Sequence, residues 1–105
     1  MKQLHRAKAK ALRNQIPRIE NMRSSNGNTI SNQFKIYTQD GVFFQSYNSI
    51  IAFKPYGDKP IVLDSHYWDY SVTTGKYRNQ FLSEGIAETR EKINNGTYLM
   101  ADLNG

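Results

Sequence analysis

Residues 30–54 read ISNQFKIYTQDGVFFQSYNSIIAFK, and this stretch decides the fold. Asp40-Gly41 is a strong hairpin signal, so residues 42–47 are expected to return as the partner of the strand before it. After a weaker turn at Asn48-Ser49, residues 50–54 form a third strand. The first strand alternates with a two-residue period, which places Ile30, Phe34, Ile36 and Thr38 on one side and Ser31, Gln33, Lys35 and Tyr37 on the other.

Shorter apolar segments extend this sheet on both sides. Residues 61–63 follow a loop rich in proline and glycine (residues 55–60) and form a fourth strand. Residues 19–22 can add an edge strand before a turn at residues 24–28, and residues 98–103 can return as a final strand. The connections are too short for crossover helices, which predicts an antiparallel meander.

The last third of the chain changes to a helical period. Thr73 or Thr74 is expected to cap a helix that runs to about residue 83, with Tyr77 and Phe81 on its inner face. A second helix covers residues 86–94. We therefore predict an α+β fold: a small antiparallel meander sheet of four to five strands, two short C-terminal helices on one face, and a basic N-terminal helix or arm.

Length and composition exclude several classes of protein. A chain of 105 residues suits one compact domain. The absence of cysteine excludes disulfides, thiolate zinc sites, iron–sulfur clusters and cysteine nucleophiles. With 38% hydrophobic residues, no stretch approaches the roughly 18 apolar residues of a membrane span. No apolar segment of a secretory signal follows the basic start, so a cytosolic location is expected.

Charge is distributed unevenly along the chain. Residues 1–23 carry seven basic side chains and one acidic side chain, a net charge of +6. Residues 24–105 carry seven basic and eight acidic side chains, a net charge of −1, together with all the aromatic residues. Because Pro17 ends the helix-forming start, we divide the chain into a basic arm or helix at residues 1–16 and a single α+β domain at residues 17–105.

The basic residues of the first 23 positions form the first candidate site. A cluster of Lys and Arg without apolar partners gains most by neutralising a polyanion and releasing its counterions. The alternative is a terminus that only keeps the protein soluble. We expect contacts to nucleic acid, or to a nucleic-acid-bound host protein, from Lys2, Arg6, Lys8, Lys10, Arg13, Arg18 and Arg23.

A second candidate site surrounds the start of the first C-terminal helix. Hydroxyl groups, free backbone N–H groups and a lysine one turn on favour an anion, and nearby rings offer flat surfaces for stacking. The alternative is structural, with threonines that cap the helix and aromatic side chains that seal the sheet. The residues of this candidate site are Tyr67, Trp68, Tyr70, Thr73, Thr74, Lys76 and Arg78.

Asp64, His66 and Asp69 are the residues that could form an acid–base or metal site. The only other histidine is His5, so an all-histidine zinc site is excluded. A lone histidine beside two aspartates is more often a surface hydrogen-bonding group, and the sequence has no Walker loop, glycine-rich dinucleotide turn or nucleophile elbow. We therefore predict no catalytic residues, no metal site and no cofactor.

Phe43 and Phe44 are neighbours that face opposite sides of one predicted strand. A single-layer sheet with helices on one face cannot bury both rings. Either the N-terminal helix covers the second face, or that face leaves an aromatic patch for a partner.

Several short segments are shared with a known group of sequences. They are NQF (residues 32–34), FQSY (44–47), IAFK (51–54), YWDYS (67–71), TT (73–74) and KYRNQFL (76–82). Through them, residues 18–103 resemble a family of small uncharacterised proteins encoded by tailed bacteriophages that infect low-GC bacteria. The resemblance implies a phage accessory protein in the bacterial cytosol. Small proteins of that kind often block host defence nucleases, CRISPR effectors included, by occupying nucleic-acid surfaces.

We expect a non-enzymatic protein that binds nucleic acid or a nucleoprotein, with inhibition of a nucleic-acid-guided host nuclease (anti-CRISPR activity) as one version. A DNA mimic would be acidic, so this basic chain would block a channel by shape and aromatic contacts or bind the nucleic acid itself. One alternative is an enzyme for a phosphorylated or nucleotide substrate, with His66 or Asp69 as base and Lys76 and Arg78 as anion clamps. The other is a structural or packaging protein that self-associates. No membrane partner is expected, and the oligomeric state stays open.

Overall fold

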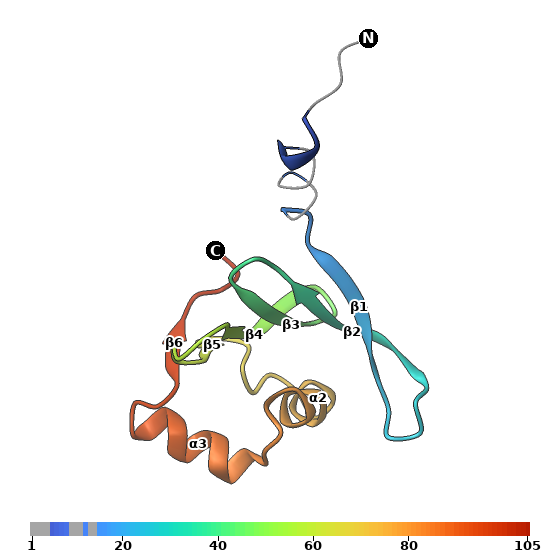
Figure 1. Ribbon diagram of the computed structural model, residues 1–105. Helices are drawn as coiled ribbons and strands as arrows, with labels where there is room; N and C mark the ends of the chain where they lie inside the picture. Colours follow the sequence, from blue (N-terminus) through green and yellow to red (C-terminus); the bar gives the residue numbers. More distant parts are fainter. Residues whose placement is uncertain (1–4, 9–11, 13–14) are drawn as a thin grey trace.

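The computed structural model describes residues 5–8, 12 and 15–105. Within this part of the chain, six strands form one sheet, and two helices follow the fifth strand (Figure 1). In chain order the elements are β1 (Arg18–Arg23), β2 (Thr29–Tyr37), β3 (Gly41–Ser46), β4 (Ser49–Pro55), β5 (Val62–Asp64), α2 (Val72–Leu82), α3 (Ile86–Asn94) and β6 (Leu99–Ala101).

The predicted α+β class is confirmed, but the sheet is larger than predicted. It has six strands among the described residues instead of four to five, because both β1 and β6 join the meander. The strands lie side by side in the order of the sequence, antiparallel from β1 to β5, whereas β6 is parallel to β5. The parallel pair is possible because α2 and α3 lie between these two strands and provide the crossover connection.

The hairpin between β2 and β3 forms where Asp40-Gly41 predicts it. The Thr38 hydroxyl closes the turn by donating to the Gly41 carbonyl, 2.9 Å away. Gly41 also pairs with Pro55 of β4, and a Cβ atom at position 41 would collide with the Lys54 carbonyl oxygen. Glycine fits here because it has no Cβ.

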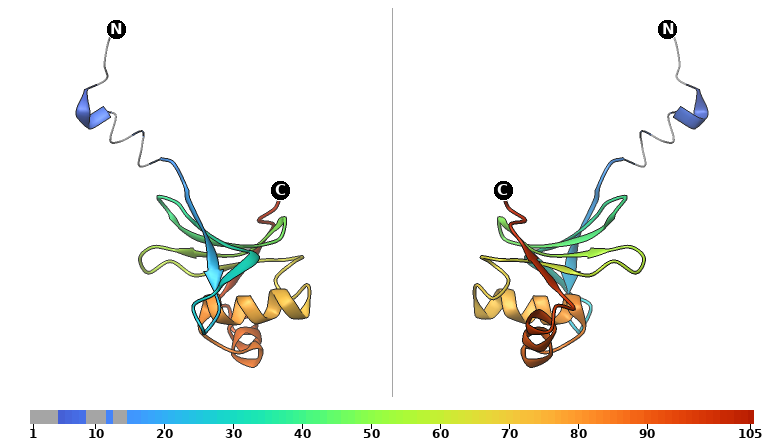
Figure 2. Two further views of the ribbon diagram at one scale, coloured as in Figure 1. Left: turned by 90° about the vertical axis from the view of Figure 1, so that its right-hand side faces the viewer. Right: turned by 90° about the vertical axis from the view of Figure 1, so that its left-hand side faces the viewer.

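Both helices lie on one face of the sheet (Figure 2). The register shows that this face carries the polar side of β2. Lys35 pairs with Phe44 of β3, and the Phe44 ring packs against Phe81 of α2 with 5.6 Å between centroids. Phe34 and Ile36, the apolar side of β2, therefore face away from the helices. The core lies between the inner face of the sheet and the helices, and its buried apolar members are Met22, Phe44, Ile51, Ala52, Leu63, Tyr77, Phe81, Leu82 and Tyr98.

α2 begins before its predicted caps. Ser71, not Thr73 or Thr74, is the N-cap, and its hydroxyl accepts the Thr74 backbone N–H at 3.1 Å. An N-cap residue needs an extended backbone, which Ser71 has, whereas both threonines already lie within the helix. The prediction that Tyr77 and Phe81 face inward is confirmed, since both are buried.

The face of the sheet away from the helices carries an apolar row. Because paired residues share a face, the register joins one side chain from every strand into this row. The rings of Phe43 and Phe53 lie 4.4 Å apart at its centre, and its two ends are exposed. The members of the outer apolar row are Ile19, Ile36, Phe43, Phe53, Val62 and Leu99.

The basic arm lies partly outside the described residues. Arg6, Ala7, Lys8 and Leu12 are helical and exposed, whereas the contacts predicted for Lys2, Lys10 and Arg13 fall on positions that the structure does not describe. The two alternatives for the outer apolar row, a cover by the N-terminal helix or a patch left for a partner, therefore both stay predictions. Among the helices of the described residues, none combines the length and apolar character that crossing a membrane requires.

Candidate nucleic-acid interface

The structure separates the residues of the two predicted sites. Arg18 and Arg23 are exposed at the two ends of β1. The helix start lies elsewhere, because Thr74 of α2 contacts Ser46 at the end of β3. The end of α2 approaches β1 instead, where the Gln80 side chain donates to the Arg23 carbonyl at 2.7 Å. Arg23 and the helix-start site therefore lie toward opposite ends of α2.

Thr74 is buried and its polar atoms serve the fold. Its hydroxyl lies 3.0 Å from the Ser46 hydroxyl and 3.1 Å from the Ser71 hydroxyl, and Ser71 also caps its backbone N–H. The Thr74 hydroxyl and backbone N–H, which an anion at the helix start would need, are therefore already hydrogen-bonded within the protein. Thr73 and Lys76 are exposed there, and the Lys76 ammonium lies 5.5 Å from the Tyr77 ring centroid.

Arg78 is 2% exposed and fixes the segment before α2 to the helix. Its guanidinium donates to the Trp68 carbonyl at 2.9 Å and to the Asp69 carboxylate at 3.1 Å. Asp69 also pairs with Arg90 of α3 at 3.6 Å. This arrangement uses Arg78 as an internal cross-link, so its charge is not presented on the surface.

The aromatic residues before α2 divide into two kinds. Tyr67 and Trp68 are half-buried and pack against the core. Tyr70 is 67% exposed, and its ring lies 5.2 Å from that of Tyr67. Tyr67 and Trp68 therefore help to seal the sheet, and Tyr70 is the ring of this group that is available to a partner.

Asp64 is buried and holds the turn that follows β5. Its carboxylate accepts the backbone N–H groups of His66, Tyr67 and Leu103 at 3.0, 2.7 and 2.8 Å. Burial by itself would raise the pKa of Asp64, but these hydrogen bonds outweigh burial and hold the pKa below its ordinary value. The carboxylate therefore has a structural role, and no group of three metal-binding side chains is found in the described part of the chain.

Glu84, between α2 and α3, organises a second internal network. Its carboxylate accepts from the Lys92 ammonium at 2.8 Å and from the Thr89 and Tyr98 hydroxyls at 2.6 and 2.7 Å. Burial would raise the pKa of Glu84, yet these bonds lower it. Burial and the bond to Glu84 raise the pKa of Tyr98 to about 12. The network joins the end of α2 to α3 and to the chain before β6.

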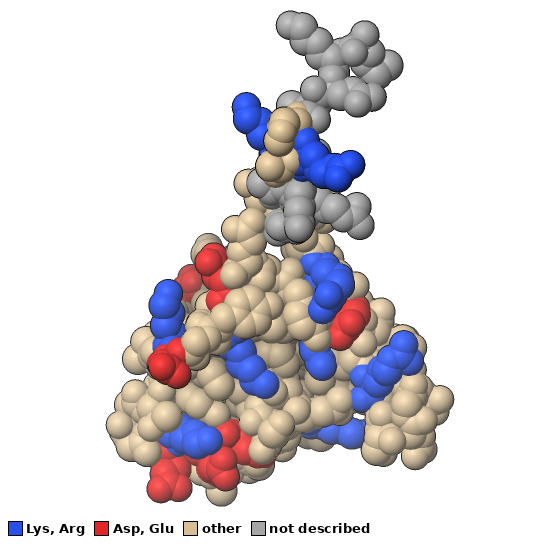
Figure 3. Space-filling view, in the orientation of Figure 1, with Lys and Arg blue, Asp and Glu red and all other residues tan. Residues whose placement is uncertain are grey.

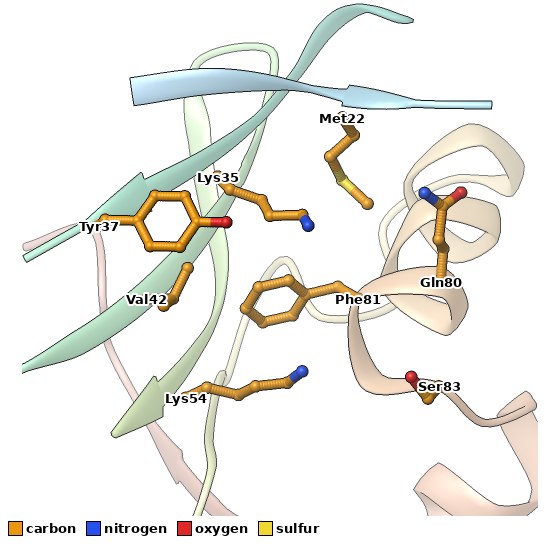
Figure 4. Close-up of a pocket in the computed structure, with 8 residues that line it drawn as sticks. All are labelled: Met22, Lys35, Tyr37, Val42, Lys54, Gln80, Phe81 and Ser83. Carbon is orange, nitrogen blue, oxygen red and sulfur yellow. The ribbon is translucent and has the colours of Figure 1, made fainter. Parts of the chain in front are cut away.

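A groove opens between the sheet and the end of α2 (Figure 4). One part of it, which we call the lysine pocket, has a volume of about 240 Å³ and adjoins an outer hollow of about 260 Å³ at the edge of β1. The two share Met22, Lys35 and Gln80, and Arg23 lines the outer hollow. We call both together the cationic groove. The lysine pocket is lined by Met22, Lys35, Tyr37, Val42, Lys54, Gln80, Phe81 and Ser83.

Lys35 and Lys54 reach the lysine pocket from β2 and β4, on either side of β3. Figure 4 shows their ammonium groups on opposite sides of the Phe81 ring, and that of Lys54 lies 4.7 Å from the ring centroid. Burial and the charge of Lys35 lower the pKa of Lys54, although Glu84 acts in the opposite direction. The pocket thus holds two positive charges that oppose each other.

Ion pairing divides the described residues into two groups. Each ion pair among them involves a cation of α2 or α3, namely Arg78, Arg90 or Lys92. The cations of β1, β2 and β4 have no acidic partner in the described part of the chain; they are Arg18, Arg23, Lys35 and Lys54.

The groove contains one acidic residue, Glu20, whose carboxylate accepts the Tyr37 hydroxyl at 2.9 Å. Arg18 stacks on the same tyrosine, with its guanidinium carbon 4.2 Å from the ring centroid. Figure 3 shows positive side chains on the described part of the arm and over the domain below it, with negative ones among them and a group of negative ones at the foot of the view. Arg18 and Arg23 therefore share β1 with one acidic residue, Glu20, which is bonded to Tyr37.

Neither predicted site includes Lys35 or Lys54. The strand pairing could have indicated them. Lys35 pairs with Phe44 in the β2–β3 hairpin, and Lys54 pairs with Val42 between β3 and β4, so both lysines lie on one face of the sheet. The alternation of β2 does not indicate which face the helices cover. The lysine pocket is therefore visible only once α2 is in place.

Fold and site define a small α+β protein with a cationic groove between its sheet and its helices. Residues 18–96 match a family of unknown function (DUF8033), and the chain belongs to this family. The match spans most of the α+β domain and leaves out the arm. No curated protein and no solved structure is significantly similar to the chain.

Proposed function

We propose that the protein binds nucleic acid without chemically altering it, through the cationic groove, the exposed arginines of β1 and the basic arm. The observation that supports this most directly is the separation of charge. Three cations of α2 and α3 (Arg78, Arg90 and Lys92) have acidic partners, whereas those of β1, β2 and β4 have none among the described residues. Unpaired Lys and Arg on one surface gain free energy by replacing the counterions of a polyanion.

The arm extends this surface along the chain. Arg6 and Lys8 are exposed, and they precede Arg18 at the start of β1. A groove and an arm of the same charge would contact phosphates at several points along one strand. Tyr37 lines the groove beside these cations, and a tyrosine ring is suited to stack on a base.

Fluorescence anisotropy with a labelled single-stranded oligonucleotide tests this proposal. A groove-neutral variant carries Arg23→Gln, Lys35→Gln and Lys54→Gln, and Lys59→Gln in the β4–β5 loop is the matched control. We expect the groove-neutral variant to bind at least about tenfold more weakly at low salt, and the control to change affinity less than about twofold. Equal affinity of all three proteins would exclude the groove as the interface. Lys76→Gln, measured in the same series, tests the helix start separately.

A phage accessory role is a more specific form of this proposal. The resemblance to tailed-phage proteins favours action in the bacterial cytosol, on the nucleic acid of a host defence nuclease such as a CRISPR effector. A basic groove suits binding to the guide or target strand better than mimicry of DNA. A pull-down from bacterial lysate tests it: a nucleoprotein partner should be lost after nuclease treatment, and a partner that is retained would indicate a direct protein contact.

The outer apolar row favours a second candidate function, self-association. Six paired side chains form an apolar surface that neither helix covers, and the ends of the row, Ile19 and Leu99, are exposed. Sedimentation velocity of the full chain should then show a concentration-dependent dimer that Leu99→Glu weakens. A strict monomer at high concentration would exclude this candidate.

A further inference from the structure

The lysine pocket is lined by hydrogen-bond donors at the end of α2. The ammonium groups of Lys35 and Lys54 point into it from the sheet (Figure 4). The Ser83 hydroxyl faces the Lys54 ammonium group across the opening. The Gln80 amide forms the far wall and already donates to the Arg23 carbonyl. These donors line one small space on both sides of the Phe81 ring, and charged donors around such a space suit a phosphoryl group.

The acidic groups that face the pocket are committed elsewhere. Glu84 acts on Lys54, but its carboxylate is held by Lys92, Thr89 and Tyr98. Glu20, in the outer hollow, accepts the Tyr37 hydroxyl. The two lysines therefore repel each other in a partly buried pocket without an acidic partner among the described residues, and a bound anion would remove this cost.

Ser83 adds a second observation at the lysine pocket. Its backbone is left-handed, with φ 58° and ψ 42°, at a helix end where glycine is the usual residue. A side chain in this conformation costs free energy, and such strain concentrates at binding sites. The hydroxyl that glycine would lack is the one that faces Lys54.

We propose that the lysine pocket binds the terminal phosphate of a nucleic-acid strand, with Lys35, Lys54 and Ser83 as its donors; this rests on the nucleic-acid-binding function proposed above. A phosphate monoester carries about −1.5 to −2 charges at neutral pH, which matches two ammonium groups, whereas a backbone diester carries one. The rest of the strand continues through the outer hollow, where Arg23 meets a following phosphate.

Isothermal titration of the full chain with three single-stranded oligonucleotides of one sequence tests this assignment. One has a 5′-phosphate, one a 3′-phosphate and one hydroxyl groups at both ends. We expect a phosphorylated end to bind about tenfold more tightly than the hydroxyl form, as one charge-assisted contact predicts. The Lys35→Gln/Lys54→Gln variant should lose this preference, and Lys59→Gln should keep it.

Ser83→Gly provides a second variant whose fold is not at risk, because glycine relieves the left-handed backbone. It should melt at the same temperature as the unchanged protein or higher, while its preference for the phosphorylated end falls several-fold. Thermal unfolding of the lysine variant in the same series shows that it is folded, since neutralising either lysine removes repulsion from the pocket.

The outcomes separate this assignment from the function on which it rests. If all oligonucleotides bind but the phosphorylated ends give no preference, or a preference that survives Lys35→Gln/Lys54→Gln, the assignment is overturned and the groove function stands. If no oligonucleotide binds, the function itself is overturned. In that case, inorganic phosphate could still raise the melting temperature of the unchanged protein but not that of Lys35→Gln/Lys54→Gln. This result would indicate that the pocket binds a small phosphorylated ligand and not the end of a strand.

Discussion

Asp64 and Glu84 are buried carboxylates that stay ionised because each accepts three hydrogen bonds. For Asp64 the donors are all backbone N–H groups, and that of Leu103 comes from 39 positions further along the chain. A sequence shows the carboxylate but not this distant donor. For this reason Asp64, His66 and Asp69 resemble an acid–base set in the sequence, whereas in the structure Asp64 joins the end of the chain to β5.

Replacing Asp64 by asparagine should lower the free energy of unfolding by roughly 2–4 kcal/mol at pH 7, because the three N–H groups lose a charged acceptor. Urea unfolding measures this change. Asp102→Asn is the matched control, since Asp102 is exposed and its substitution should stay within about 0.5 kcal/mol. A loss as small as that of the control would show that the Asp64 bonds do not stabilise the fold.

The unchanged protein and Asp64→Asn should also differ in how their stability depends on pH. The pKa of Asp64 is lower in the folded protein than its ordinary value of 3.8. Its stabilising effect is therefore complete above that value and is lost as the pH falls through the folded-state pKa. The difference in unfolding free energy between the unchanged protein and Asp64→Asn should narrow below about pH 4, and a difference that is constant down to pH 2 would contradict the assignment.

Among the elements, the β2–β3 hairpin and both helices follow from local signals. Asp40-Gly41 predicts the turn, and Tyr77 and Phe81 predict the inner face of α2, because these signals depend on residues close in sequence. The parallel β5–β6 pair and the face of β2 that the helices cover depend on long-range packing. The two-residue period of β2 is typical of a strand whose polar residues, Lys35 included, face solvent. In the structure Lys35 faces α2, because β3–β5 already supply apolar side chains on that side of the sheet.

Two glycines give opposite predictions for the same substitution. Gly41→Ala places a Cβ against the β4 backbone at Lys54 and should destabilise the fold by roughly 2–3 kcal/mol. Gly75→Ala, within α2, meets its nearest atom on Arg78 at 3.5 Å and should stabilise by roughly 0.5–1 kcal/mol. Thermal unfolding of both variants measures the contrast, and equal melting temperatures would refute the close approach of β3 and β4.

Glu84→Gln should loosen α3 and β6 together, since Glu84 bonds to both Lys92 and Tyr98. We expect a loss of roughly 2–3 kcal/mol in unfolding free energy. Hydrogen exchange should quicken most in α3 and β6 and least in the β2–β3 hairpin. Glu88→Gln, which breaks only the exposed pair to Lys92, should change stability by less than about 0.5 kcal/mol. Uniform exchange across the sheet and helices would contradict a local role for Glu84.

Across the whole molecule, the sequence predicts the cationic arm but not the cationic groove. The arm is visible because its charges lie close together in the chain. Lys35 and Lys54 are 19 positions apart and meet only when β2, β3 and β4 pair and α2 closes over them. The helix-start site shows the converse, because its donors are adjacent in sequence but Thr74 and Arg78 turn inward.

The salt dependence of nucleic-acid affinity tests the unpaired cationic surface most directly. If the seven basic residues of positions 1–23 and the two pocket lysines contact phosphates of a single strand, log K should fall with log salt at a slope of roughly −6. Replacing Lys2, Arg6, Lys8, Lys10 and Arg13 by glutamine should reduce the slope by roughly 3–4, and Lys35→Gln/Lys54→Gln should reduce it by about 1.4. A slope that neither set of substitutions changes would contradict the account.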